Sequence, residues 1–300
     1  MYLDKKIRSL FKKIDPLDYK YSKFINNIYK LLSAIKLIYQ FRNQTKKVDK
    51  NIDLEEKGFT QINSEEKVFN LILNKYSNMF KSKKFKNAFE NSKKQFLNSY
   101  KINLLENDNH IFLKFLFQNN LIGTISSYLG RYFTLNGAYI FYSKNEIFEH
   151  GRSQELHLDG DALKQLKIFV HLSDVDLNSG PLNVMPRNVS KILFSNFRKQ
   201  HLIKTRSTKI SDDKVQKNIL EKISPLIGKR GTINIVDTSN CYHYGSRPGN
   251  RERVVLLFQF VSSFSYRVRY FPNKDLITKS EYLNNFEISQ INKWMRFSDF

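Results

Sequence analysis

Cysteine is almost absent from this chain of 300 residues, which contains only Cys241. A single cysteine excludes a disulfide within the chain, and such scarcity is typical of proteins that work in a reducing compartment. The N-terminus also lacks the apolar segment and the small-residue cleavage site of a secretory signal. We therefore expect a cytoplasmic protein whose fold depends on a hydrophobic core and not on cross-links.

Long hydrophobic runs are missing as well. The most apolar early stretch, residues 25–41, is interrupted by Lys30 and Lys36, so it is too short and too charged to span a membrane. Residues 1–50 instead predict two helices separated by Pro16, with lysines between apolar residues at helical spacing. Such helices usually pack on the domain that follows them, although peripheral contact with an anionic membrane surface stays open.

Acidic residues are in the minority, since 28 Asp and Glu stand against 50 Lys and Arg and give a formal net charge of +22. Such an excess favours nucleic acid as a partner when it forms one clustered patch. Here the lysines are spread over nearly the whole chain, which indicates a compositional bias and disfavours nucleic acid. Hydrophobic residues make up 41% of the sequence, enough for the core of one large domain.

Local patterns predict helices first and mainly β structure after residue 130. A short strand over 58–62 leads into a helix that Asn63 caps, with Glu66 three residues on. A second helix is expected over 111–129, ended by Gly130. Short runs bounded by Gly, Pro, Asn and Asp then predict strands. The strands are expected over 133–142, 166–172, 181–185, 232–236 and 254–260, with helical segments within 191–226 and 288–295, and a polar helical or irregular stretch over 81–107.

Candidate metal ligands occur in the segment His157-Leu158-Asp159. In an extended chain, side chains two residues apart point to the same side, so this segment brings an imidazole and a carboxylate together. Two histidines and one carboxylate on one face of iron(II) form the site of non-haem oxygenases. Alone, the pair is more often a surface hydrogen bond, because short motifs match frequently by chance.

A second informative stretch, residues 231–260, offers a third ligand. His243 follows the predicted strand over 232–236, and Arg253 opens the next strand. A guanidinium can hold a carboxylate through two parallel hydrogen bonds. Taken singly, His243 fits a turn and Arg253 a surface charge equally well.

Taken in order, these pieces resemble the phytanoyl-CoA dioxygenase family of iron(II)/2-oxoglutarate oxygenases. The matching segments are Gln154-x-x-His157-x-Asp159, Ser179-Gly180-Pro181-Leu182, Val184-Met185-Pro186 and residues 231–253. The resemblance implies a mainly β fold with flanking helices, a double-stranded β-helix (a cupin-like jelly roll). That oxygenase domain would cover residues 51–270, between an N-terminal helical extension over 1–50 and a C-terminal tail over 271–300.

The resemblance also implies that His157, Asp159 and His243 bind Fe(2+), with 2-oxoglutarate and O2 as co-substrates. Arg253 would anchor 2-oxoglutarate. It stands one residue closer to the second histidine than is usual in the family, so Arg247 is the alternative anchor.

Further candidates for the co-substrate site are Lys167, Phe169 and Gln154. Lys167 and Phe169 lie on alternate positions of the strand after the His-x-Asp segment. Lys167 would bind the other carboxylate of 2-oxoglutarate, or it is a solvated lysine. Gln154 would orient a ligand or the substrate, or cap a strand end.

The activity implied is hydroxylation of a C–H bond of a small molecule or conjugated metabolite, with release of succinate and CO2. The carboxylate of Asp159 favours hydroxylation, because related halogenases replace it with a small residue. Where family members often have Pro-Gly-Ser-His, this chain has Pro186-Arg187-Asn188, a difference of loop structure. Two other hypotheses are a binding protein on the same fold and an oxygenase directed at nucleic acid. The sequence predicts no oligomeric state.

Overall fold

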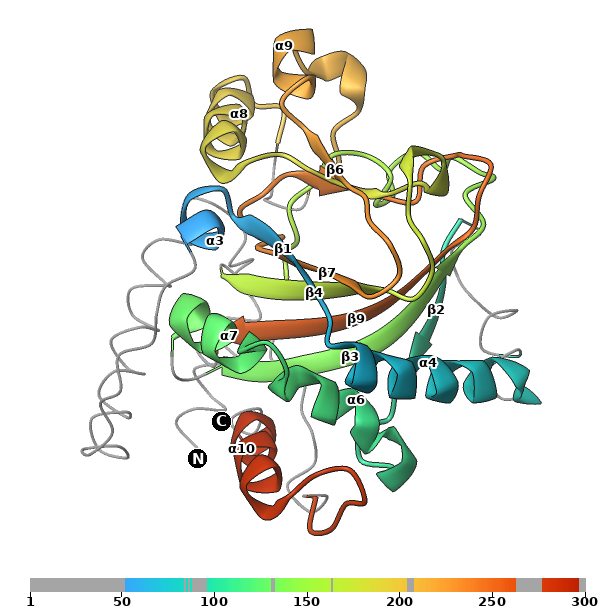
Figure 1. Ribbon diagram of the computed structural model, residues 1–300. Coiled ribbons are helices and arrows are strands. Elements are labelled where there is room, and N and C mark those ends of the chain that lie inside the picture. The colour runs from blue at the N-terminus through green and yellow to red at the C-terminus, as the bar shows by residue number, and fades with distance from the viewer. Residues whose placement is uncertain are drawn as a thin grey trace.

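The computed structural model describes residues 52–83, 85, 87, 96–130, 133–162, 164–203, 208–262 and 277–296. Within them, helices and two antiparallel sheets make up the fold (Figure 1). The helices predicted for residues 1–50 lie outside the described residues. None of the described helices combines the length and the apolar character that crossing a membrane requires.

The larger sheet has six strands in the order β1-β7-β4-β9-β3-β2, and the smaller one has three in the order β6-β5-β8. All neighbouring strands are antiparallel. The strands are β1 (Phe59–Asn63), β2 (Asn98–Lys101), β3 (Phe133–Ser143), β4 (Gln165–His171), β5 (Leu182–Val184), β6 (Ser224–Leu226), β7 (Thr232–Val236), β8 (His243–Tyr244) and β9 (Arg253–Ser262). Every strand predicted from the sequence is therefore present.

The two faces of the larger sheet differ because side chains alternate along each strand. On one face, Leu166, Ile168 and Val170 of β4 are fully buried in the main hydrophobic core. Helices α4 (Glu66–Lys81), α6 (His110–Lys114), α7 (Leu121–Leu129) and α10 (Asn285–Arg296) also contribute side chains to this core, and Figure 1 shows them on that side of the sheet. The opposite face carries Lys167 and His171 and is turned toward the smaller sheet. Polar chemistry is thus concentrated between the sheets.

Two predicted helices begin or continue differently in the structure. The helix expected over 111–129 is interrupted at Asn119 and Asn120, whose φ angles of 46° and 54° are left-handed. Asparagine adopts this left-handed conformation more readily than most residues. A residue in that conformation cannot continue a right-handed helix. The prediction that Asn63 caps α4 is wrong, because Asn63 ends β1 and Glu65 is the N-cap.

The remaining elements complete the helical layer and the edges of the sheets. The polar stretch over 81–107 contains β2, which pairs with β3 and was not predicted. The expected helical insert between strands is present, and it also includes β6. The helices not yet named are α3 (Ile52–Glu56), α8 (Arg187–Lys199) and α9 (Lys217–Leu220).

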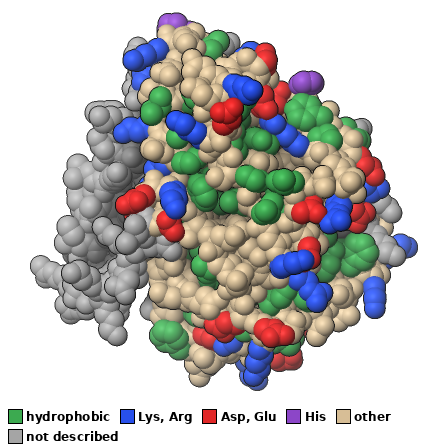
Figure 2. Space-filling model, turned by 45° about the horizontal axis from the view of Figure 1, so that its top comes forward, with side chains coloured by type: hydrophobic (Ala, Val, Ile, Leu, Met, Phe, Trp, Pro, Cys, Tyr) green, Lys and Arg blue, Asp and Glu red, His purple; other side chains and the backbone are tan. Residues whose placement is uncertain are grey.

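Charges of both signs are mixed on the molecular face shown in Figure 2. Lys and Arg side chains are scattered among Asp and Glu side chains and small hydrophobic groups. Several of the exposed charges form ion pairs, such as Lys57 with Asp53 and Arg251 with Asp176. On the described part of this face, the basic residues therefore form no continuous patch.

Candidate metal centre

Backbone hydrogen bonds bring the two histidines of the predicted metal site together. The amide of His157 donates to the carbonyl of His243 at 3.1 Å, and the amide of His243 donates to the carbonyl of His157 at 3.0 Å. His243 opens β8, which pairs with Val184 of β5. The amide of Asp159 donates to the carbonyl of Thr238 at 2.8 Å. Segments distant in the sequence are thereby fixed in one register.

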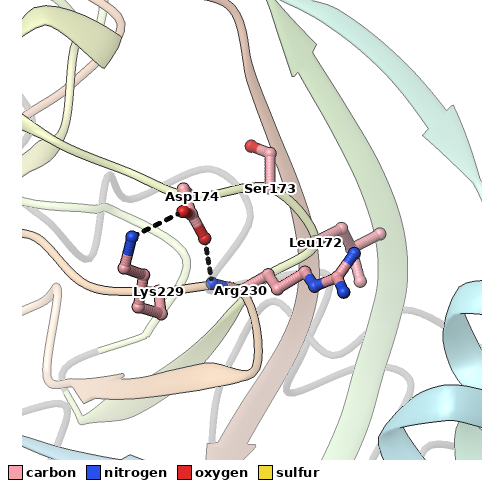
Figure 3. Close-up of a pocket in the computed structure, with 5 residues that line it drawn as sticks. All are labelled: Leu172, Ser173, Asp174, Lys229 and Arg230. Atoms are coloured by element: carbon pink, nitrogen blue, oxygen red, sulfur yellow. Dashed lines mark hydrogen bonds and ion pairs between the residues drawn. The ribbon is translucent and has the colours of Figure 1, made fainter.

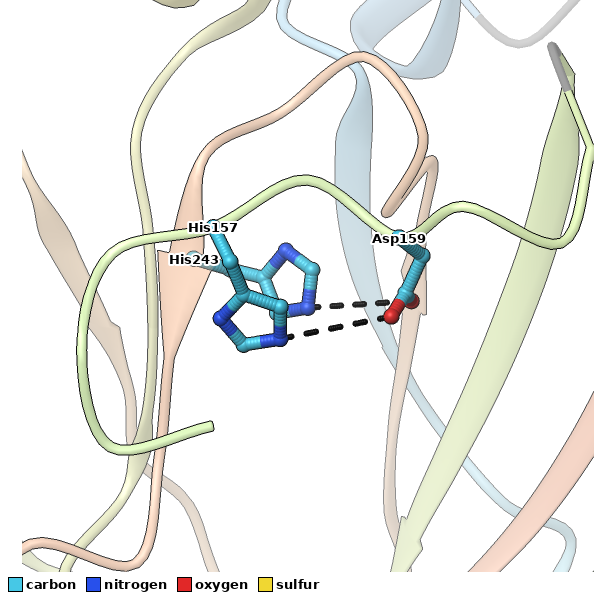
Figure 4. A group of neighbouring side chains, drawn as sticks. All are labelled: His157, Asp159 and His243. Carbon is cyan, nitrogen blue, oxygen red and sulfur yellow. Dashed lines mark ion pairs between the residues drawn. The ribbon is translucent and has the colours of Figure 1, made fainter. Parts of the chain in front are cut away.

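The side chains of His157, Asp159 and His243 converge (Figure 4). Nε2 of His157 lies 4.0 Å from Oδ1 of Asp159, and Nε2 of His243 lies 3.7 Å from Oδ2. One ligand atom from each of the three residues lies within 4.8 Å of the others. Two imidazoles and one carboxylate on one side form the donor set of mononuclear iron(II) sites.

Each imidazole is oriented by a hydrogen bond at its other nitrogen. Nδ1 of His157 lies 2.8 Å from the carbonyl oxygen of Glu155, and Nδ1 of His243 lies 2.9 Å from that of Cys241. A carbonyl oxygen only accepts, so both Nδ1 atoms carry the hydrogen. The Nε2 lone pairs are therefore the ones that face Asp159, as metal-bound histidines require.

The protonation states also suit a metal ion. Burial lowers the pKa of His157 and of His243, so both rings are neutral. Burial acts to raise the pKa of Asp159, but the charge and the hydrogen bond of the Lys167 ammonium act against it, and that pKa lies well below its usual range. Neutral imidazoles and an ionised carboxylate are the forms that bind a divalent cation. The donor set therefore fits iron(II).

Strand β4 holds the carboxylate of Asp159 from one side. Nζ of Lys167 lies 2.7 Å from Oδ2 of Asp159, and Nε2 of Gln165 donates to the same oxygen at 3.1 Å. Gln165 also donates to Oγ1 of Thr238 at 2.8 Å. Gln165 was not among the residues predicted for the site, although it precedes Lys167 by two residues on β4 and therefore shares its face.

Arg253, the first residue of β9, presents a buried guanidinium. Its Nη2 donates to Oγ of Ser246 at 2.7 Å, and the residue is 9% exposed. Burial lowers the pKa of Arg253 to about 10, so the group keeps its charge at neutral pH. Among the described residues, no carboxylate lies within salt-bridge distance of Arg253. A buried charge without a partner is costly, which makes this a place for an anion.

The alternative anchor, Arg247, makes several contacts with protein groups. Its Nη1 and Nη2 donate to the two carboxylate oxygens of Asp212 at 2.7 and 2.8 Å. Its Nε donates to the carbonyl of Gln154 at 2.8 Å, and its guanidinium lies 3.4 Å from the centre of the Tyr244 ring. These contacts tie the turn after β8 to its neighbours.

Gln154 also links neighbouring loops through hydrogen bonds. Its Nε2 donates to the carbonyl of Ile147 at 2.6 Å and also to that of Ser246, and its Oε1 accepts from the amide of Glu149 at 2.7 Å. The side chain is fully buried. Gln154 therefore holds the loop after β3 against the turn that carries Ser246.

The Ser179-Gly180 segment packs beneath the same turn. The amide of Ser246 donates to the carbonyl of Gly180 at 3.0 Å. Gly180 has a φ of 54°, and a Cβ at this position would lie 2.6 Å from the carbonyl oxygen of Arg247 and 2.6 Å from Oδ1 of Asn145. Only glycine fits this left-handed, crowded position. The motif thus places the turn that presents Ser246 to Arg253.

Arg187, where the sequence departs from the family pattern, connects three helices to the larger sheet. It opens α8, and its Nη1 donates to the carbonyl of Glu55 at 2.6 Å. Its Nη2 donates to Oη of Tyr128 and lies 3.5 Å from Oδ2 of Asp237. These contacts are structural and do not involve the metal ligands.

A separate open pocket lies where β4 ends, and Figure 3 shows its lining residues Leu172, Ser173, Asp174, Lys229 and Arg230. Asp174 accepts a hydrogen bond from the amide of Arg230 and pairs with Nζ of Lys229, both at 2.9 Å. The Asp174 carboxylate is thus paired within the pocket, which contains none of the metal-ligand residues. The pocket belongs to the turns after β4 and before β7 and is separate from the metal site.

A polar row on the inner face includes His171, at the far end of β4 from the metal ligands. Nδ2 of Asn234 donates to Nε2 of His171 at 3.0 Å, while Oδ1 of Asn234 accepts from Nε2 of Gln61 at 2.8 Å. Burial and the charge of Arg253 lower the pKa of His171 to about 4. His171 therefore stays neutral beside Arg253.

This shift predicts that the protein loses stability as the pH falls from about 6.5 toward 4, since only the unfolded chain takes up a proton at this histidine there. The contribution lost at pH 5 is about 2 kcal/mol. His171→Gln keeps an acceptor for Asn234 but removes the titration. Urea unfolding at pH 7.5 and pH 5 should show a smaller difference for this variant, by about that amount. The exposed His201→Asn serves as control, and an unchanged pH difference in His171→Gln would contradict the prediction.

Comparison with known proteins gives matches only at the level of structure. No protein-family model matches the sequence, and no curated protein matches it. A structure of EctD from S. alaskensis with 2-oxoglutarate and 5-hydroxyectoine matches with a TM-score of 0.51 and 12% identity, over 74% of this chain and 79% of that chain. EctD with bound Fe matches with a TM-score of 0.51 and 13% identity, over 74% and 80%. The two chains therefore share a fold.

A third structure is a weaker match. HygX from Streptomyces hygroscopicus, with nickel and 2-oxoglutarate bound, matches with a TM-score of 0.48 and 12% identity, over 70% of this chain and 85% of that chain. Membership of the phytanoyl-CoA dioxygenase family stays a prediction.

Proposed function

We propose that this protein is an iron(II)/2-oxoglutarate-dependent dioxygenase that hydroxylates a C–H bond of a small molecule or conjugated metabolite. The observation that carries the proposal is the convergence of His157, Asp159 and His243 in a buried site, each in the protonation state of a metal ligand. That donor set, with the rest of the coordination sphere open, suits iron(II) and dioxygen.

A second feature supports 2-oxoglutarate as the co-substrate. Arg253 offers a buried cation that no described carboxylate neutralises, and Ser246 holds its Nη2 at 2.7 Å. A guanidinium in such surroundings suits the distal carboxylate of a dicarboxylic acid. Arg253 is preferred to Arg247 for this role, because Arg247 is already bound by Asp212 and Gln154 and lies over the ring of Tyr244.

When bound, iron and 2-oxoglutarate supply the oxidising chemistry, in which one oxygen atom of O2 enters the substrate and the other enters succinate, with loss of CO2. The residues of the chain supply the positions. His157, Asp159 and His243 hold the metal, and Arg253 orients the co-substrate. Buried apolar neighbours on the inner face, such as Leu257, keep water out.

The fold and the extent of the domain belong to the same proposal. The shared fold with EctD and the two facing antiparallel sheets support a double-stranded β-helix, a cupin-like jelly roll, over residues 51–270. The order of the sequence motifs supports the phytanoyl-CoA dioxygenase family.

The test is anaerobic titration of iron(II) and then 2-oxoglutarate into the purified protein. The expected result is a weak visible charge-transfer band that needs both additions, followed by formation of succinate when O2 is admitted. A folded protein that gives neither the band nor succinate would overturn the proposal and leave a binding protein on the same fold.

A further inference from the structure

Lys167 forms an ion pair with a residue of the candidate metal set. Its Nζ lies 2.7 Å from Oδ2 of Asp159, and this is its only ion pair among the described residues. The side chains of Lys167 and Asp159 are 17% and 15% exposed, so solvent screens the pair weakly. The Lys167 ammonium is thus paired with Asp159, the carboxylate that a metal ion would also bind.

The backbone of Lys167 is fixed. Strand β4 lies between β7 and β9, and Lys167 is paired with Val236 on one side and with Gln259 on the other. Only the flexible side chain can move away from Asp159. The positive charge therefore stays within the length of a lysine side chain of the metal ligands, whatever the site holds.

Because of this placement, the Lys167 ammonium competes with a divalent cation for the carboxylate of Asp159. Two positive groups that share one carboxylate repel each other, and the repulsion is stronger away from water. At 2.7 Å from Oδ2 of Asp159, Lys167 is close enough to this carboxylate to weaken the binding of a metal ion in the absence of other ligands.

A co-substrate with two carboxylates changes this balance. Once a metal ion has taken Asp159, the Lys167 ammonium has lost its ion-pair partner and remains largely buried, which is costly. Arg253 can bind one carboxylate of 2-oxoglutarate, and the other carboxylate then lies on the metal side. That carboxylate can replace Asp159 as the negative partner of the Lys167 ammonium.

We propose that Lys167 couples the two binding steps, so that it weakens binding of the metal alone and strengthens binding of the metal together with 2-oxoglutarate. The inference rests on the proposed function, because it takes 2-oxoglutarate as the dicarboxylate. Since such coupling is reciprocal, the metal and 2-oxoglutarate each raise the affinity for the other.

The test is calorimetric titration of cobalt(II), as a stand-in for iron(II), into wild type, Lys167→Met and Lys229→Met, with and without saturating 2-oxoglutarate. Lys229 is the matched control, because it pairs with Asp174 at 2.9 Å in the open pocket away from the metal ligands. Without 2-oxoglutarate, Lys167→Met should bind cobalt(II) about tenfold more tightly than wild type. With 2-oxoglutarate the order should reverse, so that Lys167→Met binds cobalt(II) more weakly than wild type, and Lys229→Met should match wild type throughout. An advantage of Lys167→Met that persists with 2-oxoglutarate would overturn the inference.

Thermal unfolding gives a second readout. Without metal, Lys167→Met leaves the Asp159 carboxylate without its cation, so its Tm should fall below that of wild type. Saturating cobalt(II) should restore it. A fall in Tm that cobalt(II) does not restore, or cobalt(II) affinity that is equal to or weaker than wild type, would overturn the coupling role.

A charge-conserving variant covers the case in which Lys167→Met does not fold. Lys167→Arg keeps the charge and can hold Asp159 through two hydrogen bonds, so it should bind cobalt(II) more weakly than wild type. Equal or tighter binding by Lys167→Arg would overturn the inference. Failure of the proposed function looks different, since wild type and all variants would then show no cobalt(II) binding.

Discussion

Replacing His157 by alanine is expected to lower the affinity for iron(II) about a hundredfold or more and to abolish succinate formation. The variant removes one of two neutral imidazoles and leaves Asp159 and His243 with too few donors to complete the site. The fold should survive, because the backbone hydrogen bonds between residues 157 and 243 do not depend on the side chain. Anaerobic titration with iron(II), followed by a succinate assay, measures both effects.

The control for this variant is His150→Ala. The side chain of His150 is 85% exposed and contacts Glu155, so its removal tests the general effect of losing a histidine. Iron(II) affinity and succinate formation should be unchanged in this control. If His157→Ala bound iron(II) as tightly as wild type, the assignment of the metal ligands would be wrong.

Replacing Arg253 by methionine is expected to weaken 2-oxoglutarate binding to the metal-loaded protein about a hundredfold, equal to about 3 kcal/mol. Methionine keeps much of the volume and removes the charge. Because Arg253 is buried without a carboxylate partner among the described residues, the ligand-free variant should be at least as stable as wild type. Calorimetry with 2-oxoglutarate under anaerobic conditions measures the affinity, and thermal unfolding measures the stability.

Arg247→Met separates the two candidate anchors. This variant breaks the paired hydrogen bonds to Asp212 and the stacking on Tyr244, so it should lower the Tm. Its affinity for 2-oxoglutarate should change by much less than that of Arg253→Met. The opposite pattern, with Arg247→Met losing the co-substrate and Arg253→Met retaining it, would reverse the assignment.

Local signals in the sequence were sufficient to predict strands β1, β3, β4, β5, β7 and β9 and to single out His157 and Asp159 as candidate metal ligands. Alternating or continuous apolar residues bounded by turn residues marked β4, β7 and β9, because these strands are buried on at least one face. The segment His157-Leu158-Asp159 is extended, so its two polar side chains do share one side. The third ligand, His243, could be chosen only through the family resemblance.

Other features depend on contacts that no local pattern encodes. The interruption at Asn119 and Asn120 lies inside an apolar run that is compatible with one continuous helix. The engagement of Arg247 by Asp212 needs the fold of the helical insert, and the contact of Lys167 with Asp159 needs the register of β4. The alternation of side chains along β4 could have identified Gln165 and His171 as inward-facing residues, since they lie two and four positions from Lys167.

The position of β9 has a consequence for biosynthesis. This strand lies between β4 and β3 in the sheet, yet among the described elements only α10 follows it in the chain. Until residues 253–262 have left the ribosome, β1, β7 and β4 are separated from β3 and β2, and each group has an open edge. A nascent chain that stops before β9 exposes apolar residues that Phe258 and its neighbours would cover. Such a fragment is a target for chaperones and proteases, and it cannot act as a smaller version of the protein.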